Sequence, residues 1–179
     1  MIQSDWFWIK KDPEAPTVID AKGLNRSNYP YFTDAESFSK VDDSVAYYEY
    51  NGHFVQCDIL FEPTFLICDA LQTLFQFIEP ELQFKGVQLY SRQDSKRFAT
   101  PMYWLPLLPF SDDAVSDQTQ SVGGKPVKLV LNPEPLRDRR LIHCRLPAAD
   151  IWLVSLEAAE CLLRRQPIGI ELEPVLIRQ

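Results

Sequence analysis

The amino-acid sequence predicts an α+β fold with a mostly antiparallel or mixed sheet and two principal helices in a repeated strand–helix–strand unit. Two observations lead to this fold class. Strand-like stretches cluster along the chain and do not alternate strictly with helices, which favours α+β over a doubly wound sheet. A strand–helix–strand pattern also occurs twice, at residues 65–90 and 151–177. We expect a single domain of 179 residues, with two pseudo-repeated halves at about 1–100 and 101–179 as the alternative.

The closing unit, residues 151–177, has the clearest local signals. An apolar run meets Ser155, a good N-cap because its hydroxyl accepts a hydrogen bond from the open first turn of a helix. Glu157 follows in that turn, where the helix dipole favours negative charge. Pro167 ends the helix and Gly169 opens a second strand.

The earlier unit matches this one when it is shifted by 87 positions, the shift that places Cys68 on Ser155 (155 minus 68). Gly86 then meets Gly169 if four positions after the helix are dropped. Coincidence is the competing interpretation, since any two strand–helix–strand units look partly alike. The apolar helix stripes also coincide, with Leu71, Leu74 and Phe75 on Ala158, Cys161 and Leu162.

Two more elements are predicted in the first third of the chain. Residues 6–9 form a short aromatic strand that is apolar on both faces, so we expect both faces to be covered. Asn51 and Gly52 lie between strand-like residues 44–50 and 53–60. This spacing predicts a β-hairpin, because both residues accept the positive φ angles of a type I′ turn.

The prolines decide the prediction for residues 102–110, an apolar and aromatic stretch. Pro106 and Pro109 cannot donate to a strand ladder, so we expect an edge strand or an extended segment here. Residues 111–125 are polar and lack periodicity, which predicts an exposed loop. Two further strands are predicted, at residues 126–131 and 139–146.

Composition and charge limit the class of protein. The formal net charge is −7, which argues against binding to a nucleic-acid backbone and is compatible with a basic partner. The N-terminus lacks the pattern of a signal peptide, and no apolar run approaches the roughly 18 residues of a membrane span. We therefore expect a cytoplasmic protein that acts neither on nucleic acid nor in a membrane.

The residues that most often perform catalysis or bind metals are few. His143 and Cys144 are neighbours in a predicted strand, so their side chains point to opposite faces. His53 and Cys57 share a face but lie about 13 Å apart at the usual strand rise. A cross-pair of Cys57 with His143 stays open. No spacing in the sequence fits a catalytic, cofactor or metal site, so we expect no enzyme activity and no cofactor.

The four cysteines contain no Cys-x-x-Cys pair. They fall within apolar strand or helix patterns or at the edge of one. We interpret them as reduced, small core residues, as is usual in a cytoplasmic protein. They are Cys57, Cys68, Cys144 and Cys161.

The acidic residues Asp112, Asp113 and Asp117 are the candidate partner-binding residues. They lie in the most polar stretch of the chain and lack the 12-residue pattern and terminal Glu of a calcium loop. A solvated loop explains them without any function. The functional hypothesis is an acidic contact surface that attracts a basic partner.

Four stretches together resemble a known family. They are FLICDALQTLFQFIEPELQFKGVQLY, MYWLPLLPF, PVKLVLN and the closing IWLVSLEAAECLLRRQPIGIELEPV. The combination resembles the bacterial DUF1629, or Imm11-like, group, over residues 60–177. Cys68 stands where a Ser is more usual in that pattern. The motif is structural, so no functional residues are carried over from it.

That resemblance implies an immunity-type protein, which blocks a cognate toxin by direct, non-catalytic binding. The acidic charge would suit a basic toxin domain. The alternative is an interaction or scaffold module without a toxin partner, or a small-molecule-binding domain. In the latter, Tyr29, Tyr31 and Phe32 would line the pocket. The oligomeric state is left open by the sequence.

Overall fold

The computed structural model describes residues 5–14, 24, 30–48, 56–92 and 101–178, and it confirms the α+β fold class. Sheets dominate, and three α-helices occur within the described residues. The helices are α1 (Ala35–Ser39), α2 (Asp69–Ile78) and α3 (Leu156–Leu163), and the 3-10 turns are η1 (Asp112–Ala114) and η2 (Glu134–Leu136). The strands are β1 (Trp6–Lys11), β2 (Ser44–Tyr48), β3 (Ile59–Leu60), β4 (Leu66–Cys68), β5 (Gln83–Ser91), β6 (Met102–Leu107), β7 (Gln120–Val122), β8 (Lys125–Lys128), β9 (Val130–Leu131), β10 (Leu141–Leu146), β11 (Ala149–Ser155), β12 (Ile170–Pro174) and β13 (Leu176–Ile177).

The chain forms two compact units whose segments interleave in the sequence. What we call the N-terminal unit contains residues 11–107 and 166–170. The C-terminal unit contains the remainder, including the first ten residues. The number of domains stays a prediction, and each unit is described by itself.

The N-terminal unit is built on a five-stranded mixed sheet in the order β2-β5-β6-β4-β3. β2 runs parallel to β5, and the other three pairings are antiparallel. β4 and β5 both run antiparallel to β6, which lies between them, so they are parallel to each other. Helix α2 joins them. It contacts β4 and β6 and buries the stripe Leu71, Leu74, Phe75 and Ile78.

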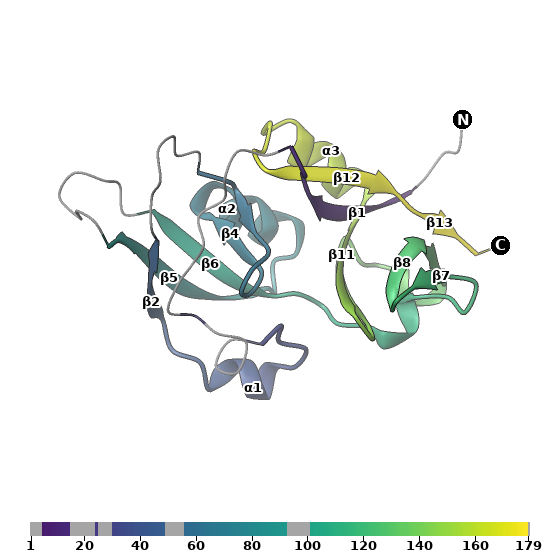
Figure 1. Cartoon of the computed structure of the whole chain (residues 1–179), viewed down its shortest axis with the longest axis horizontal. Helices are drawn as coiled ribbons and strands as arrows, with labels where there is room; N and C mark the ends of the chain where they lie inside the picture. Colours follow the sequence, from purple (N-terminus) through teal and green to yellow (C-terminus); the bar gives the residue numbers. More distant parts are fainter. Residues whose placement is uncertain (1–4, 15–23, 25–29, 49–55, 93–100, 179) are drawn as a thin grey trace. The chain divides into compact units, whose positions relative to one another are not determined.

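The C-terminal unit contains a four-stranded sheet in the order β10-β11-β1-β12. β1 runs antiparallel to β11, and Figure 1 shows it lying beside β12. The bonds from Asp12 N to Gly169 O (3.1 Å) and from Val175 N to Trp6 O (3.0 Å) make β1 and β12 antiparallel, because the residue number rises along one strand as it falls along the other. β13, directly after β12, pairs in parallel with β9.

These two sheets have the same topology. In each, a hairpin (β3–β4 or β10–β11) is followed by a helix and by a strand parallel to the second hairpin strand, with one antiparallel strand in the gap. The strand after the helix also has a parallel neighbour on its other side. In the N-terminal unit β5 pairs with β2, and in the C-terminal unit β13, which directly follows β12, pairs with β9. The repeated strand–helix–strand unit is thus confirmed, and it extends over five strands.

The registers agree as well as the strand order. Cys68 N bonds to Asp58 O at 2.8 Å, and Ser155 N bonds to Arg140 O at 2.9 Å, so both N-cap residues occupy the same place in their sheets. Across the sheet from them lie two buried aromatic residues, Tyr103 opposite Cys68 and Trp6 opposite Ser155. The two equivalent N-cap residues, Cys68 and Ser155, are separated by the 87 positions inferred from the sequence.

One pairing inferred from the sequence is wrong. Val87 lies opposite Tyr103 and Val175 bonds to Trp6, so Val87 and Val175 are equivalent positions. Gly86 lies inside β5, whereas Gly169 precedes β12 with φ at +89°. The two glycines therefore occupy different places, because the connections after the two helices differ in length.

The strand in the gap comes from a different place in each unit. β6 follows β5 along the chain, as a continuous meander would. β1 fills the equivalent gap between β11 and β12, yet it lies at the opposite end of the chain from β12. The C-terminal unit is complete only because the N-terminal strand enters it.

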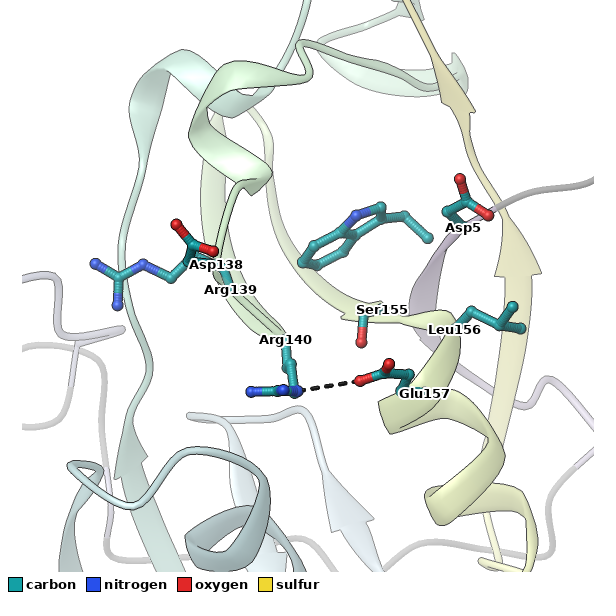
Figure 2. Close-up of a pocket in the computed structure, with 8 residues that line it drawn as sticks. Asp5, Asp138, Arg139, Arg140, Ser155, Leu156 and Glu157 are labelled. Atoms are coloured by element: carbon teal, nitrogen blue, oxygen red, sulfur yellow. Dashed lines mark hydrogen bonds and ion pairs between the residues drawn. The ribbon is translucent and has the colours of Figure 1, made fainter.

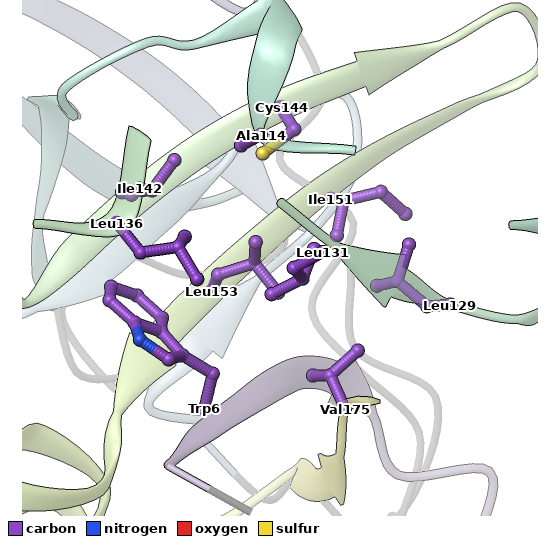
Figure 3. Packing of buried hydrophobic residues seen from close by; sticks show 10 residues of the cluster. All are labelled: Trp6, Ala114, Leu129, Leu131, Leu136, Ile142, Cys144, Ile151, Leu153 and Val175. Atoms are coloured by element: carbon purple, nitrogen blue, oxygen red, sulfur yellow. The ribbon is translucent and has the colours of Figure 1, made fainter. Parts of the chain in front are cut away.

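The core of the C-terminal unit shows how β1 is held. Trp6 packs with Ile142, Leu153 and Val175, all buried, so β1 shares one core with β10, β11 and the end of β12 (Figure 3). Ile9, on the other face of β1, is only 1% exposed. The expectation that both faces of this strand are covered therefore agrees with its burial.

The predicted hairpin around Asn51 and Gly52 is wrong. β2 and β3 lie at opposite edges of their sheet, and β2 pairs with β5. The two turn residues themselves fall outside the described residues, as does His53. Pairing with β5 buries Ala46 and Tyr48, a long-range gain that a local turn signal does not report.

The prediction of an edge strand at residues 102–110 is also wrong, because β6 lies in the middle of the sheet. Leu89 N bonds to Pro101 O, which sets the phase of the β5–β6 ladder. Phe84 and Pro106 then form a non-hydrogen-bonded pair, so the nitrogen of Pro106 faces away from β5. On that other side the pairing with β4 covers only Tyr103 and Trp104, so Pro106 lies beyond the β4–β6 ladder and its missing N–H removes no bond from it.

The stretch from residue 111 to 131 departs from its prediction. Residues 111–125 were expected to be an exposed loop, but they contain η1 and β7, and Ala114 is fully buried. The single strand expected at 126–131 is divided into β8 and β9, which belong to different sheets. The break falls where Leu129 turns into the core.

Replacing Ile9 by Ala should lower the free energy of unfolding by about 2–5 kcal/mol, because it leaves a cavity in a fully covered strand. Ile9→Val, which removes one methyl group, should cost about 0.5–1.5 kcal/mol. Urea titration followed by tryptophan fluorescence measures both. Val127→Ala, at a side chain that is 63% exposed, is the control and should change stability by less than about 0.5 kcal/mol. Equal effects of Ile9→Ala and Val127→Ala would contradict the placement of β1 in the sheet.

Candidate functional site

The three candidate acidic residues lie close together along one edge of the C-terminal unit. Asp112 and Asp113 start η1, Asp117 lies three residues after its end, and all three are exposed. Asp117 accepts a bond from Arg178 Nη1 at 3.0 Å, so its charge is partly matched. Asp112 and Asp113 form no ion pair with the described residues. Two exposed negative charges are therefore left for an outside partner.

A β-hairpin made of β7 and β8 follows directly. Gly123 and Gly124 form its turn with φ at +59° and +78°, the double positive φ that a two-residue hairpin needs. All three residues of β7 are exposed, and Val122 and Val127 are 71% and 63% exposed. Lys125 stands opposite Val122. The hairpin thus presents two large apolar side chains and two lysines, Lys125 and Lys128, to solvent and contributes little to the core.

Sequence reasoning missed this hairpin, although a signal for it was present. Two glycines between stretches that contain Val122 and Val127 are a hairpin signature. The polarity of the surrounding residues outweighed it. Because both strands are solvent-exposed, their sequence does not alternate between apolar and polar residues as a half-buried strand does.

The hairpin has no counterpart in residues 40–43, which lie directly before β2 in the N-terminal unit. In the N-terminal unit only residues 40–43 separate α1 from β2. In the C-terminal unit residues 115–129 separate η1 from β9, the strand equivalent to β2, and they contain the hairpin. Additions to one copy of a repeat often carry its binding surface. The hairpin together with Asp112, Asp113 and Asp117 is therefore the candidate site, which we call the hairpin surface.

A cavity of about 460 Å³ lies elsewhere in the C-terminal unit, at the start of α3. Figure 2 shows Asp5, Asp138 and Ser155 around it, with Arg140 pairing with Glu157 at 3.2 Å. The side chains of this ion pair are more than half exposed, so the pair contributes little to stability.

The donors of the first turn of α3 are largely used by the chain itself. Leu156 N bonds to Asp5 O at 2.8 Å, and Ala158 N bonds to Ser155 Oγ at 3.3 Å. The predicted N-cap at Ser155 is thereby confirmed. With acidic and basic side chains both present, the cavity has no single charge that would select a ligand.

The N-terminal unit has a cavity of the same volume, about 460 Å³, at the equivalent place. Asp58, Cys68 and Asp69 line it, where Arg140, Ser155 and Leu156 stand in the other unit. The Cys68 thiol donates to Asp58 Oδ1 at 3.1 Å, and Asp58 Oδ2 accepts from Ile168 N at 2.6 Å. Asp58 thus fastens the residues before β12 to the start of α2.

The three buried thiols are poor nucleophiles. Burial, reinforced by the hydrogen bond to Asp58, raises the pKa of Cys68 to about 12. Burial likewise raises the pKa of Cys144 to about 12 and that of Cys57 above its usual value. All four cysteines are free, and Cys161 is the one with partial exposure. Because the thiolate is the reactive form, the three buried thiols are chemically inert at neutral pH.

His143 belongs to a buried polar pair on the face of β10 opposite Cys144. Its Nε2 lies 2.7 Å from Asp150 Oδ1, which also accepts from Arg145 Nε at 3.0 Å. The imidazole stacks on Trp152 and meets Phe110 edge-on. Cys144 points into the opposite core, as the strand alternation predicts. Cys57 and His143 belong to different units.

The pKa of Asp150 reflects this environment. Burial raises the pKa, but the hydrogen bonds from His143 and Arg145 lower it by more, and the net result is below the usual value. The carboxylate is therefore held ionised by its partners. Its arrangement is that of a structural ion pair on a covered sheet face.

Within the described part of the chain, no group of three or more His, Cys, Asp or Glu side chains is arranged to hold a metal ion. No described helix is long and apolar enough to cross a membrane. Tyr31 donates to Phe61 O at 2.7 Å and Phe32 packs edge-on against Phe38, so these two side chains of the predicted aromatic pocket pack within their own unit. Tyr29 lies outside the described residues.

No family model matches the chain, and no significant match to a protein of curated function is found. The resemblance to the DUF1629 or Imm11-like group therefore stays a prediction.

Asp150→Asn should lower stability by about 1–3 kcal/mol at pH 7, since it removes a charge-assisted pair of hydrogen bonds. A carboxyl whose folded pKa is depressed stabilises the fold above its unfolded pKa of about 3.9 and loses that contribution as pH falls through the folded value. The difference from wild type should therefore shrink below about pH 4. Thermal unfolding from pH 2 to 8 measures it, with the exposed Asp113→Asn as control. A difference that is independent of pH would contradict the assignment.

In the folded protein, Cys161 should react with a thiol reagent such as Ellman's reagent, while the three buried cysteines stay unmodified. At pKa about 12 the thiolate fractions of Cys68 and Cys144 are about 10³-fold below that of a free thiol, and burial lowers the thiolate fraction of Cys57 in the same direction. Cys161→Ser should abolish the native reaction, and denaturant should expose all remaining thiols. Rapid reaction of the folded Cys161→Ser variant would show that a second thiol is accessible and activated.

Proposed function

We propose that this protein is an immunity-type binding protein that blocks a cognate toxin by direct, non-catalytic contact. The proposal places the contact at the hairpin surface and takes the partner to be a basic toxin domain. It also places the complex in the cytoplasm, where the proposed toxin would act. The resemblance stated above supplies the immunity role, and the features of the hairpin surface support binding to a protein.

The observation that carries the proposal is the added hairpin. One copy of the repeated unit has it and the other does not, and it leaves Val122 and Val127 mostly exposed. Exposed apolar side chains rimmed by charge are typical of protein-binding surfaces. A hairpin that gives so little to its own core is best explained by a partner that covers it.

The charges of the hairpin surface suit a partner with a basic patch. Asp112 and Asp113 are exposed and without an ion pair among the described residues, and the whole chain carries a net charge of −7. Such charges accelerate association with a basic protein more than they tighten the final complex. Lys125, on the hairpin itself, would meet an acidic residue at the edge of the contact.

The alternative function, binding of a small molecule, is favoured by one observation. The two cavities of about 460 Å³ occupy equivalent places in the two units. Each lies within the size range of small-molecule sites. The cavity of the C-terminal unit is mixed in charge, however, and the carboxylate of Asp58 in the other cavity already accepts hydrogen bonds from within the chain. Two N–H groups of the first turn of α3 are also bonded within the chain, so we place this function second.

A pull-down from the native host, followed by mass spectrometry, should identify one stoichiometric protein partner. The purified pair is then tested by calorimetry. Asp112→Asn, Asp113→Asn and Asp117→Asn together should slow association and weaken its dependence on salt, and Val122→Ser with Val127→Ser should raise Kd by about 10-fold or more.

Matched controls separate the surface from general effects. Glu36→Gln, Asp42→Asn and Glu160→Gln remove the same charge from exposed positions elsewhere, and Phe77→Ser removes a side chain that is 79% exposed on α2. These variants should bind normally. Unchanged binding by both hairpin-surface variants would overturn the proposed contact. A partner without toxicity to cells lacking this protein would overturn the immunity role.

A further inference from the structure

The chain order of the repeat points to a second kind of contact, which does not depend on the proposed function. The two units share strand order, strand directions and register, and they differ in where the gap-filling strand comes from. β6 is continuous with its own unit, whereas β1 reaches the gap between β11 and β12 from the far end of the chain. The slot for β1 is thus formed by residues that lie more than a hundred positions away in sequence.

We propose that β1 of one chain can complete the C-terminal unit of a second copy, which gives a dimer by reciprocal exchange of β1. The occupant of the slot is always the same strand, from the same chain or from another. Identical strands make identical contacts, so exchange costs no packing energy. A partner chain would therefore be recognised by Trp6, Ile9 and the backbone of β1.

The contacts of β1 make it a complete unit of exchange. Its backbone bonds to β11 on one side and to β12 on the other, and Trp6 and Ile9 bury one face each. Lys10 adds an ion pair to Glu173 on β12 at 2.5 Å. All these groups lie on β1 and on the strands that receive it, so a copy of β1 from another chain satisfies every one of them.

Concentration decides between the closed and the exchanged form. The β1 strand of the same chain competes with that of another chain at an effective concentration on the order of 1 mM. Folding at about 1 μM should therefore give closed monomers, and folding near 1 mM should give a substantial exchanged fraction. Withdrawing β1 from a folded chain breaks its pairing with both β11 and β12. The closed monomer and the exchanged dimer should therefore interconvert slowly once the chains have folded.

The test uses two full-length variants. Lys10 lies opposite Glu171, because the bonds of Asp12 to Gly169 and of Val175 to Trp6 fix the register. Paired Cα atoms in adjacent strands lie within the range that a disulfide spans. Lys10→Cys and Glu171→Cys chains, mixed unfolded and refolded together at about 1 mM, should form a disulfide between chains on mild oxidation. Non-reducing electrophoresis detects it, and light scattering measures the mass.

Three controls make the result decisive. The double variant Lys10→Cys/Glu171→Cys, folded at about 1 μM, should close the same bond within one chain and so verify the register. Each single variant refolded alone reports any linkage through the native thiols. The two single variants mixed after folding should stay unlinked. A wild-type chain that remains monomeric by light scattering after refolding at every concentration would overturn the proposal, and so would closure in the double variant with no linkage in the mixture.

Discussion

The structure depends on a gap one strand wide that a parallel strand–helix–strand unit leaves in its sheet. β4 and β5 are joined by α2, and β11 and β12 are joined by α3, yet neither pair is adjacent. Each strand that borders the gap carries backbone donors and acceptors that must be satisfied. A single antiparallel strand satisfies both sides at once. β6 does this in one unit and β1 in the other, and every core described above is built around one of these two strands.

The gap-filling strand also explains why equivalent residues differ in chemistry. Tyr103 and Trp6 hold the same place beside the helix N-caps Cys68 and Ser155. Tyr103 uses its hydroxyl to reach Cys57 O at 2.5 Å, whereas Trp6 packs into an apolar cluster. Asp58 in one unit becomes Arg140 in the other, and the local partners change with it, from a thiol and a backbone N–H to Glu157. The topology is kept by backbone bonds that any residue can make, so the side chains around it are free to diverge.

The hairpin surface belongs to a different category, since the fold does not need it. Val122 and Val127 contribute almost nothing to the core, and the equivalent connection in the other unit is much shorter. The acidic residues beside it were recognisable from the sequence because three aspartates in a polar stretch are usually exposed. The pairing of Asp117 with Arg178 was not, because it joins residues far apart in the chain. The buried pair of His143 and Asp150 was missed for the same reason, since seven positions of separation reveal nothing until a tight hairpin makes the two strands neighbours.

The sequence by itself determined the local elements: the cap at Ser155, the end of α3 before Pro167, the apolar stripes of α2 and α3, and the two-faced apolar character of β1. Each of these follows from side chains within a few residues of one another, which act in the isolated chain as they do in the fold. Only the tertiary structure decided which strands are neighbours. β2 pairs with β5, β6 lies inside its sheet despite Pro106, and β1 lies between β11 and β12, two strands from the other end of the chain. The physical reason is that strand pairing is made by backbone N–H and C=O groups, which all residues except proline share. The sequence marks which faces are apolar, but the choice among strands that could cover them is made by the packing of the whole unit.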